Sequence, residues 1–495
     1  MASIFNTLSI GYSGLSVAQV GINTTGQNIA NAENEGYTRQ RVITSAVTPL
    51  NTSAGNVGNG VEVQDIKRVF DNFVFDRYNK ISSDKEYSDF ERQTLEELST
   101  YFPEVDGVGI KADLAEYYNM WQTFADNPDN DSIKVALAKQ TETLTQHIQQ
   151  TQTQVLDLQM QINDQLGANI NEVNSLAKQL AEINKSIEIA ESGGGYSAND
   201  LRDKRNIIEK SLSKLIGAEV NQGQIETNIQ IDSNSNTRDG SYTLSVNGFN
   251  IVDGGTYHPL RITKDDNEYG FYSLFYERQD GTLIAMEEEI NGGKVGAILA
   301  LRGGAIDTTS GMPNDGVLQN VVAEMDAFAS GLIESTNNLY AKSARAKMES
   351  NNINLHPASS LVSSSFNINP GSFDIIVYDI DGNEVAKRTI EINTATSMSG
   401  VANSNSIQGQ IEANKDDNSD ANANNDIDDF IKFNYTPSAT GEIKLELGMD
   451  ALFESQGYTF AVVDNLPDGK FASGTNFAGA IGLGSYFEGT NARDI

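Results

Sequence analysis

The residue types that most often carry catalysis are sparse in this chain of 495 residues. It has no cysteine, and its three histidines, His147, His258 and His356, fall in three different segments. Neither the H-E-x-x-H pattern of zinc peptidases nor the G-x-S-x-G turn of serine hydrolases occurs. Carboxylates are abundant, with 68 Asp and Glu, but a pair of them indicates acid–base catalysis only when its geometry is known. The sequence therefore predicts no catalytic residues and no enzyme.

Glycine-rich and acidic segments are the remaining places where a ligand could bind, and each has a simpler explanation. Residues 55–60 and 292–295 lack the spacing or the hydroxyl residue of nucleotide-binding loops, so we interpret them as ordinary turns. Residues 379–383 begin like a calcium loop but lack its final glutamate, and their Asp-Gly pair is typical of a hairpin turn. The acidic segment 412–429 is predicted to be a solvated loop. We expect no cofactor and no metal.

The charge balance argues against two large classes of partner. Against 34 Lys and Arg stand 68 Asp and Glu, which gives a formal net charge of −34. Such a charge repels nucleic-acid phosphates and anionic lipid headgroups, so we predict no nucleic acid and no membrane as partners. No apolar run approaches the roughly 18 residues of a membrane span. No Lys or Arg precedes Arg39, so a secretory signal with a basic start is not expected.

Helical periodicity dominates the middle of the chain. Residues 131–190 contain no proline and a single glycine, Gly167. Their apolar residues recur at steps of three and four, which predicts one helix roughly 90 Å long, with a break near Gly167 left open. Residues 199–215 and 317–344 have the same amphipathic spacing. A bundle or coiled coil is the expected use of such helices.

Two other regions have the period of two that is typical of strands. Residues 218–289 carry turn pairs at positions 239–240, 247–248 and 280–281, read as D-G, N-G and D-G. Residues 366–460 have their clearest hairpin in the pair 373–378 and 385–392. We therefore predict an α+β multidomain fold: an elongated helical bundle or coiled-coil rod with two inserted β-rich domains and an N-terminal heptad helix.

The first thirty residues form the most regular pattern. Apolar or small residues follow steps of four and three from Ile4 to Ile29, which is typical of a helix that packs along one narrow seam. The apolar members, predicted to form an assembly interface, are Ile4, Leu8, Leu15, Ala18, Ile22 and Ile29. Four glycines weaken this helix by roughly 1 kcal/mol each relative to alanine. We therefore predict that residues 1–60 stay unstructured until a partner covers the seam.

Motifs at and after this seam carry a family resemblance. Residues 25–31 read T-G-Q-N-I-A-N and residues 36–40 read G-Y-T-R-Q, which resembles the N-terminal signature of the bacterial flagellar axial proteins. Residues 199–206, N-D-L-R-D-K-R-N, are similar to a hallmark of one of these families, the FlgK family of hook-associated proteins, and residues 292–303 resemble it again. By this resemblance six residues would fix the turn between an inner helix and an outer domain: Asn28, Asn31, Gly36, Tyr37, Arg39 and Gln40.

The resemblance also implies a function and a location. Members of this family are structural adaptors that join the flagellar hook to the filament, and they leave the cell unfolded through the flagellar type III apparatus. The expected location is therefore extracellular, at the hook–filament junction. The implied partners are further copies in a ring or short helical layer, the hook protein, and an adjacent hook-associated protein or flagellin. An export chaperone is implied as well.

Five parts are expected along the chain. They are an N-terminal assembly helix and turn (1–60), a helical rod domain (61–217 with 304–345), a first β-rich domain (218–303), a second β-rich outer domain (346–475) and a return segment toward the helical core (476–495). The resemblance implies closing helices after Ile495, so we expect either a truncated chain or a short variant.

Two alternatives come from other classes. The first is another axial protein of the hook or distal-rod type, against which the motif at 199–206 and the long helix argue. The second is a secreted adhesin or enzyme carried on an axial-type anchor, with its function in residues 366–470. Deletion of that region would separate the second alternative from the junction protein.

Overall fold

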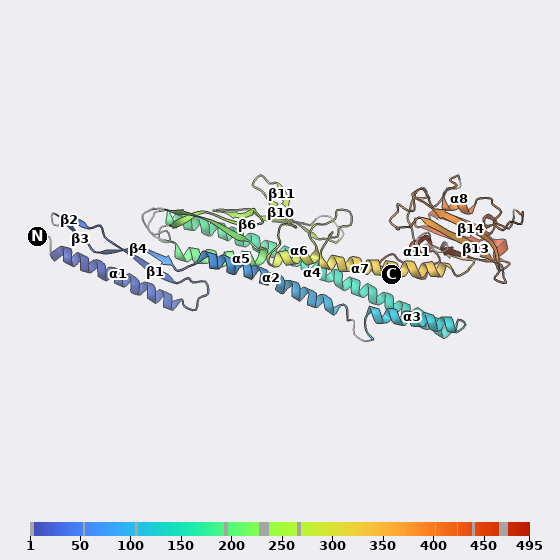
Figure 1. Ribbon diagram of the computed structural model, residues 1–495, viewed down its shortest axis with the longest axis horizontal. Helices are drawn as coiled ribbons and strands as arrows, with labels where there is room; N and C mark the ends of the chain where they lie inside the picture. The colour runs from blue at the N-terminus through green and yellow to red at the C-terminus, as the bar shows by residue number, and fades with distance from the viewer. Residues whose placement is uncertain are drawn as a thin grey trace. The chain divides into compact units, whose positions relative to one another are not determined.

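The computed structural model describes residues 4–52, 55–103, 107–192, 197–226, 237–264, 269–400, 402–422, 424–437, 441–464 and 474–495. Long helices and several small antiparallel sheets make up the chain (Figure 1), which confirms the predicted α+β class. The residues group into two compact units, 1–101 with 155–321 and 102–154 with 322–495. None of the described helices is long and apolar enough to cross a membrane.

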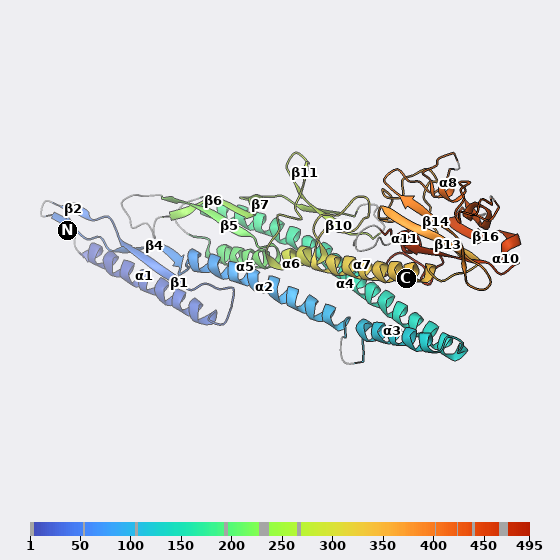
Figure 2. The same ribbon diagram turned by 45° about the vertical axis from the view of Figure 1, so that its right-hand side comes forward.

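The first unit begins with a helix and a hairpin. Its elements up to the long helix are α1 (Ile4–Ala30), β1 (Gln40–Ala46), β2 (Leu50–Thr52), β3 (Gly55–Val57), β4 (Val61–Arg68) and α2 (Asn72–Thr100). Strands β1 and β4 pair antiparallel, from Gln40 opposite Arg68 to Ala46 opposite Val61. Helix α1 packs along this hairpin, as both ribbon views show (Figure 1, Figure 2).

The rest of the first unit packs two sheets against helices. It contains α5 (Asn199–Ile216), β5 (Glu219–Glu226), β6 (Thr237–Val246), β7 (Phe249–Asp253), β8 (Thr256–Tyr257), β9 (Leu260–Lys264), β10 (Tyr272–Glu277), β11 (Leu283–Ala285) and α6 (Gly293–Arg302). Strands β5 to β8 form one sheet in sequence order, and β10 lies between β9 and β11 in the other. Apolar side chains from both sheets, from α5 and α6 and from the C-terminal half of the long helix share one core.

The long helix α4 runs from Asp131 to Glu191, close to the predicted range. Asn130 precedes it, and its Oδ1 accepts a hydrogen bond from the backbone N–H of Ser132 at 3.0 Å. Gly167 causes no break. A Cβ at this position would lie 3.2 Å from Cε2 of Tyr272, so the glycine lets β10 approach the helix closely. Tyr272 is more than 100 residues further along the chain, and its close contact explains why a glycine occupies position 167 of the helix.

The three turn pairs predicted in the first β region have different outcomes. Asn247 and Gly248 join β6 to β7 with positive φ angles of 45° and 87°, as the hairpin prediction requires. The turn at 280–281 also forms, with Gly281 at φ 80°. The prediction at 239–240 is wrong, because both residues lie inside β6. The ladder between β5 and β6 shifts register opposite them, between Gln222 and Gln224, which is the place of a bulge.

The second unit combines helices with two three-stranded sheets. Its elements are α3 (Ile110–Asp126), the first part of α4, most of α7 (Val317–Ala341), β12 (Lys347–Glu349), β13 (Gly371–Tyr378), β14 (Glu384–Ile392), α8 (Ile407–Ile411), α9 (Ile427–Phe430), β15 (Ile431–Pro437), β16 (Ile443–Met449), α10 (Ala451–Glu454), β17 (Thr459–Asp464) and α11 (Phe477–Ala480). Strand β13 lies between β14 and β17, and β16 lies between β12 and β15. The predicted hairpin of this region is confirmed as β13 and β14.

The final residues pack back onto this unit. The ring of Phe477 stacks on Phe373 of β13, with 4.9 Å between centroids. Asn337 of α7 is fully buried, and its Oδ1 accepts hydrogen bonds from the backbone N–H groups of Tyr486 and Phe487 at 2.8 and 3.0 Å. One amide side chain therefore holds the end of the chain to a helix about 150 residues earlier.

The acidic segment 412–429 is only partly the solvated loop that the sequence predicts. Asp417 accepts hydrogen bonds from Nε and Nη2 of Arg388 in β14, and Asp428 accepts one from Nη2 at 2.8 Å. Arg388 is 3% exposed. Two of the carboxylates thus fold over a buried arginine, and this ion pairing explains the acidic composition there better than solvation does.

Candidate assembly surface of the N-terminal helix

The seam predicted from the sequence lies open along α1. Leu8, Leu15, Ile22 and Ile29 have 66–73% of their surfaces exposed, and Ala18 is exposed as well. Ile4 begins the helix, although its side chain falls outside the described part of the chain. Isolated exposed apolar residues are ordinary, but a continuous row of them marks an interaction surface. The structure therefore brings five of the six predicted interface residues onto one uncovered face.

Two aromatic residues that the sequence analysis missed widen this face. Phe5 and Tyr12 are 87% and 74% exposed. They are seven residues apart and each lies three residues before a seam leucine, so the same heptad spacing could have identified them. No Asp, Glu, Lys, Arg or His occurs between Ile4 and Ala30. The result is a neutral, apolar helix face on a chain whose net charge is −34.

The opposite face of α1 corrects the prediction that residues 1–60 lack structure. Ile10, Ser13, Val17, Val20 and Thr24 follow steps of three and four, and they are half-buried or buried. Ser13 Oγ accepts a hydrogen bond from the backbone N–H of Val61 at 3.2 Å. The helix is ordered without a partner on its seam because this second face packs on the β1–β4 hairpin.

Asn28 ties the end of α1 to the start of β1. Its Nδ2 donates to the backbone carbonyl of Gln40 at 2.9 Å, and its Oδ1 accepts from the backbone N–H of Gln40 at 2.8 Å. The hydroxyl of Tyr37 donates to the same Oδ1 at 2.8 Å. Burial, and then the carboxylates of Asp203 and Asp200, raise the pKa of Tyr37, which keeps this hydroxyl a donor. Three of the six predicted turn residues therefore form one hydrogen-bonded group.

The other three turn residues act differently. Asn31 donates from Nδ2 to the carbonyl of Gln27, a local bond within the helix end. Gly36 leaves room for Ile207 of α5, whose Cδ1 would lie 2.6 Å from an added Cβ. Arg39 is exposed, and its side chain makes no hydrogen bond or ion pair to the described residues, although its carbonyl accepts from Val69. The structure does not bring Asn31 or Arg39 into the group around Asn28.

A residue outside the predicted set connects this turn to the helical part of the unit. Asp203 of α5 accepts from the backbone N–H of Thr38 at 3.1 Å and from Nη1 of Arg68 at 2.7 Å. The same Nη1 donates to Asn206 Oδ1 at 2.7 Å. Arg68 is the last residue of β4, so Asp203 and Asn206 hold both the turn and the hairpin. Residues 36–40 and residues 199–206, which are separated by about 160 residues in the sequence, are therefore in contact: Thr38 and Asp203 are 165 residues apart.

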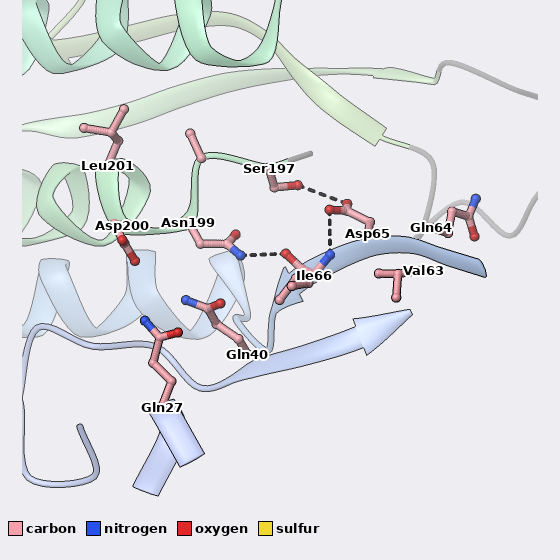
Figure 3. Close-up of a pocket in the computed structure, with 11 residues that line it drawn as sticks. Gln27, Gln40, Val63, Gln64, Asp65, Ile66, Ser197, Asn199, Asp200 and Leu201 are labelled. Atoms are coloured by element: carbon pink, nitrogen blue, oxygen red, sulfur yellow. Dashed lines mark hydrogen bonds between the residues drawn. The ribbon is translucent and has the colours of Figure 1, made fainter. Parts of the chain in front are cut away.

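The start of α5 and the hairpin line a shallow pocket of about 510 Å³ (Figure 3). Asn199 Nδ2 donates to the carbonyl of Ile66 at 2.6 Å, and Ser197 Oγ donates to Asp65 at 3.1 Å. Gln27 and Gln40 also face this space. The lining mixes amide and carboxylate side chains with apolar ones and contains no histidine or cysteine, which suits packing contacts better than catalysis.

Helix α5 is also fixed to the end of α4. Arg202 forms a two-point ion pair with Glu191, with Nε and Nη2 donating at 2.9 and 2.8 Å. Arg205 and Glu209 form an ion pair four residues apart within α5, at 3.4 Å. Within the parts of the chain that the structure describes, no group of three His, Cys, Asp or Glu side chains could hold a metal ion. The geometry is that of packing between elements of the chain.

Comparison with known proteins points to one family. The family model for the flagellar hook-associated protein FlgK helical domain matches residues 95–352, just over half of the chain. The flagellar hook-associated protein 1 of Salmonella typhimurium is 26% identical over 300 residues, 60% of this chain and 52% of that protein. The proteins of the same name from Escherichia coli K12 and Bacillus subtilis are 26% identical over 318 residues and 25% over 287, covering 62% and 55% of this chain and 54% and 55% of theirs.

A solved structure is also similar, that of the flagellar hook junction protein FlgK from Burkholderia pseudomallei. It has 17% identity and a TM-score of 0.43, and the match covers 82% of this chain and 66% of that one. The family model defines the class as a flagellar hook-associated protein. The chain belongs to the FlgK family of flagellar hook-associated proteins. It spans about half the length of the curated relatives it matches.

Proposed function

We propose that this chain is a structural adaptor of the bacterial flagellum that joins the hook to the filament, outside the cell. The observation that supports this most directly is the neutral, exposed seam of α1, which is held by the Asn28 and Asp203 contacts to a helical domain of the FlgK family. The relatives it matches carry the name flagellar hook-associated protein 1. The role is mechanical, and no catalytic step is involved.

Assembly proceeds by burial of the seam. Helix α1 is already formed on the hairpin, so what remains for assembly is to cover the row from Leu8 to Ile29. Burying a leucine or isoleucine side chain contributes about 1.5–3 kcal/mol, so four such residues supply several kcal/mol to each contact. The occupants are further copies of this chain and other axial proteins: the hook protein below and a hook-associated protein or flagellin above.

The parts of the chain take separate positions in this proposal. Residues 1–60 form the inner layer, residues 61–217 and 304–345 the middle layer, and residues 218–303 and 346–475 project outward, with 476–495 returning to the middle layer. Contacts between unlike surfaces of neighbouring copies generate rings or open helices, as a tube requires. An export chaperone would hold the chain before assembly.

Complementation tests the proposal. The full chain is expressed in a motile strain whose own gene for this protein is deleted, and filament attachment is scored by electron microscopy and swimming in soft agar. We expect the chain to restore filaments, and a variant with Leu15→Asp and Ile22→Asp to be secreted but to leave hooks bare. Val135→Asp, which places a single charge at a 69% exposed valine of α4, is the control for an added surface charge and should restore filaments. Failure of the unaltered chain, or normal filaments with the double variant, would contradict the proposal.

A further inference from the structure

One surface of the first unit has the opposite charge to the rest of the chain. Helix α5 exposes Lys204 and Ile207, and Lys210 and Lys214 are half-exposed beside them. The four positions fall within about 120° of the helix circumference at 100° per residue. Of the acidic residues of α5, Glu209 is 4% exposed and accepts from Tyr242, and Asp203 is buried in its pair with Arg68. Asp200 is exposed and lies one turn before Lys204 on the same side, so this side of the helix carries three lysines against one carboxylate. We call the surface formed by Lys204, Ile207, Lys210 and Lys214 the lysine face.

The lysine face has no carboxylate partner among the described residues and is partly apolar. None of its three lysines forms an ion pair with a described residue, whereas lysines elsewhere in the chain, such as Lys347 and Lys387, have carboxylate partners. Lys210 contacts Tyr78 in α2: its Nζ lies 5.1 Å from the ring centroid, and its hydrogen bond to the hydroxyl lowers the pKa of Tyr78. Tyr78 and Ile81, one helical turn further along α2, are 48% and 58% exposed. Aromatic and apolar groups beside unpaired cations are typical of a protein interface.

We propose that the lysine face docks on an acidic surface of a second copy of this chain. We choose a second copy because of its charge: it has 68 Asp and Glu against 34 Lys and Arg, so its carboxylates outnumber its cations two to one. The lysine face cannot pair with itself, because like charges would then face each other. The contact is therefore between unlike surfaces, the kind that produces a ring or helix instead of a closed pair.

The position of the lysine face connects it to the assembly surface. Ile207 lies against Gly36, in the turn that follows α1, and Lys204 adjoins Asp203, which binds the backbone of Thr38 in that turn. A neighbour bound here would sit beside the turn that holds the seam helix. This inference rests on the proposed function in supposing that copies stand side by side, and it adds which surface of each copy makes the lateral contact.

Self-association of the purified full chain tests the inference. Three proteins are compared by sedimentation equilibrium: the unaltered chain, a triple variant with Lys204→Gln, Lys210→Gln and Lys214→Gln, and a control with Lys134→Gln, Lys139→Gln and Lys178→Gln on α4. Both variants lower the charge by the same amount, so general repulsion between copies is matched. At low salt we expect the lysine-face variant to lose about tenfold in association constant and the control to lose little. The difference should vanish near 0.5 M salt, where charges are screened beyond about 4 Å.

Further measurements keep folding and assembly effects apart. Circular dichroism and thermal unfolding should be the same for all three proteins, and replacement of the three lysines by arginine should restore association. Carbodiimide cross-linking of a mixture of ¹⁵N-labelled and unlabelled chains should join these lysines to carboxylates of the other copy. Equal association of the unaltered chain and the lysine-face variant at low salt would overturn the inference, as would a fully monomeric unaltered chain or cross-links confined to single copies.

The outcome also separates this inference from the proposed function. If the unaltered chain associates through the lysine face but restores no filaments in the deletion strain, the inference holds and the proposed function fails. If filaments are restored but the three lysines make no difference to association, the inference alone fails.

Discussion

Asp203 of α5 and Arg68 of β4 form an ion pair with 2.7 Å between Oδ1 and Nη1, and each side chain is less than a tenth exposed. The other oxygen of Asp203 accepts a hydrogen bond from the backbone N–H of Thr38. Burial lowers the pKa of Arg68, and the hydrogen bond to Asp203 opposes that shift. The hairpin that carries α1 therefore depends on a charge 135 residues further along the chain.

Replacing Asp203 should loosen the hairpin and its turn. Asp203→Asn keeps an oxygen for Thr38 but leaves the buried charge of Arg68 without a counter-ion, which should cost about 3 kcal/mol of unfolding free energy. Hydrogen exchange should show faster exchange at Thr38 and along β1 and β4, and urea unfolding should give the magnitude. Asp200→Asn, a few residues earlier and exposed, should change stability by less than about 0.5 kcal/mol. Equal effects of the two variants would contradict the role assigned to Asp203.

The turn after α1 should be destabilised by loss of either the donor or the acceptor of the Asn28 side-chain amide. Asn28→Ala removes the partners of both backbone groups of Gln40 and of the Tyr37 hydroxyl, at about 1–3 kcal/mol for the groups left unpaired. Asn28→Asp keeps the acceptor but has no hydrogen to donate to the Gln40 carbonyl, so it should also destabilise the turn. Exchange of the Gln40 amide hydrogen reports on the site directly. Asn31→Ala is the control, since its bond is local; a similar effect there would argue against a special role for Asn28.

The two faces of α1 should respond differently to polar substitution. Leu15→Asn and Ile22→Asn lie on the open seam and should leave the stability of the isolated chain within about 0.5 kcal/mol of its original value. Val17→Asn and Val20→Asn lie on the face toward the hairpin and should each cost about 1 kcal/mol. Exchange protection within α1 measures both. A seam substitution that melted the helix in the monomer would mean that the seam is already covered there.

Arg388 should be central to the second unit. Arg388→Met leaves Asp417 and Asp428 without their cation, and we expect a loss of about 3 kcal/mol in unfolding free energy by urea denaturation. The control is Lys432→Met, which removes a 60% exposed lysine paired with Asp450 at 3.4 Å and should cost less than about 1 kcal/mol. If both variants were equally stable, the folding of the acidic segment over β14 would not depend on this arginine.

Tyr117 of α3 should make the second unit sensitive to alkali. Burial raises the pKa of its hydroxyl from 10.0 to about 12, so the folded chain keeps the proton over a range where the unfolded chain has lost it. Its contribution to stability is complete below pH 10 and disappears as the pH rises to about 12. In Tyr117→Phe, the fall in stability between pH 9 and pH 11 should be smaller by about 1 kcal/mol. An unchanged slope, measured by urea unfolding at both pH values, would contradict this assignment.

Regular periodicity explains why much of the fold could be predicted. The steps of three and four in residues 131–190 depend on one helix and its own side chains, and the observed helix ends at Glu191. The hairpin at Asn247-Gly248 is encoded by two adjacent residues that accept positive φ angles. The hairpin predicted from the Asp-Gly pair at 239–240 does not form, because both residues lie within β6 opposite a bulge in β5. A bulge depends on how two strands pair, which the local sequence does not show.

Of the candidate assembly surface, the open seam of α1 could be predicted from the sequence, whereas its contacts to the hairpin and to α5 could not. The seam is visible because large apolar residues stand out at heptad spacing, whereas the hairpin-facing side of α1 relies on small residues such as Ser13 and Thr24, which carry little hydropathic signal. Asp203 and Arg68 belong to separate segments, and no local pattern indicates that they pair. Only the folded chain shows that the turn and residues 199–206 are parts of one contact.

Because α1 has no Asp, Glu, Lys, Arg or His between Ile4 and Ala30, its open face offers nothing for dissolved ions to shield and nothing to titrate near neutrality. An attachment made through it would keep its strength in fresh water, brine or mildly acidic surroundings alike. Lateral contacts through lysines would weaken in brine, because salt screens charges. In a tube assembled through the apolar seam and the lysine face, high salt would therefore loosen the lateral contacts and leave the seam contacts unchanged.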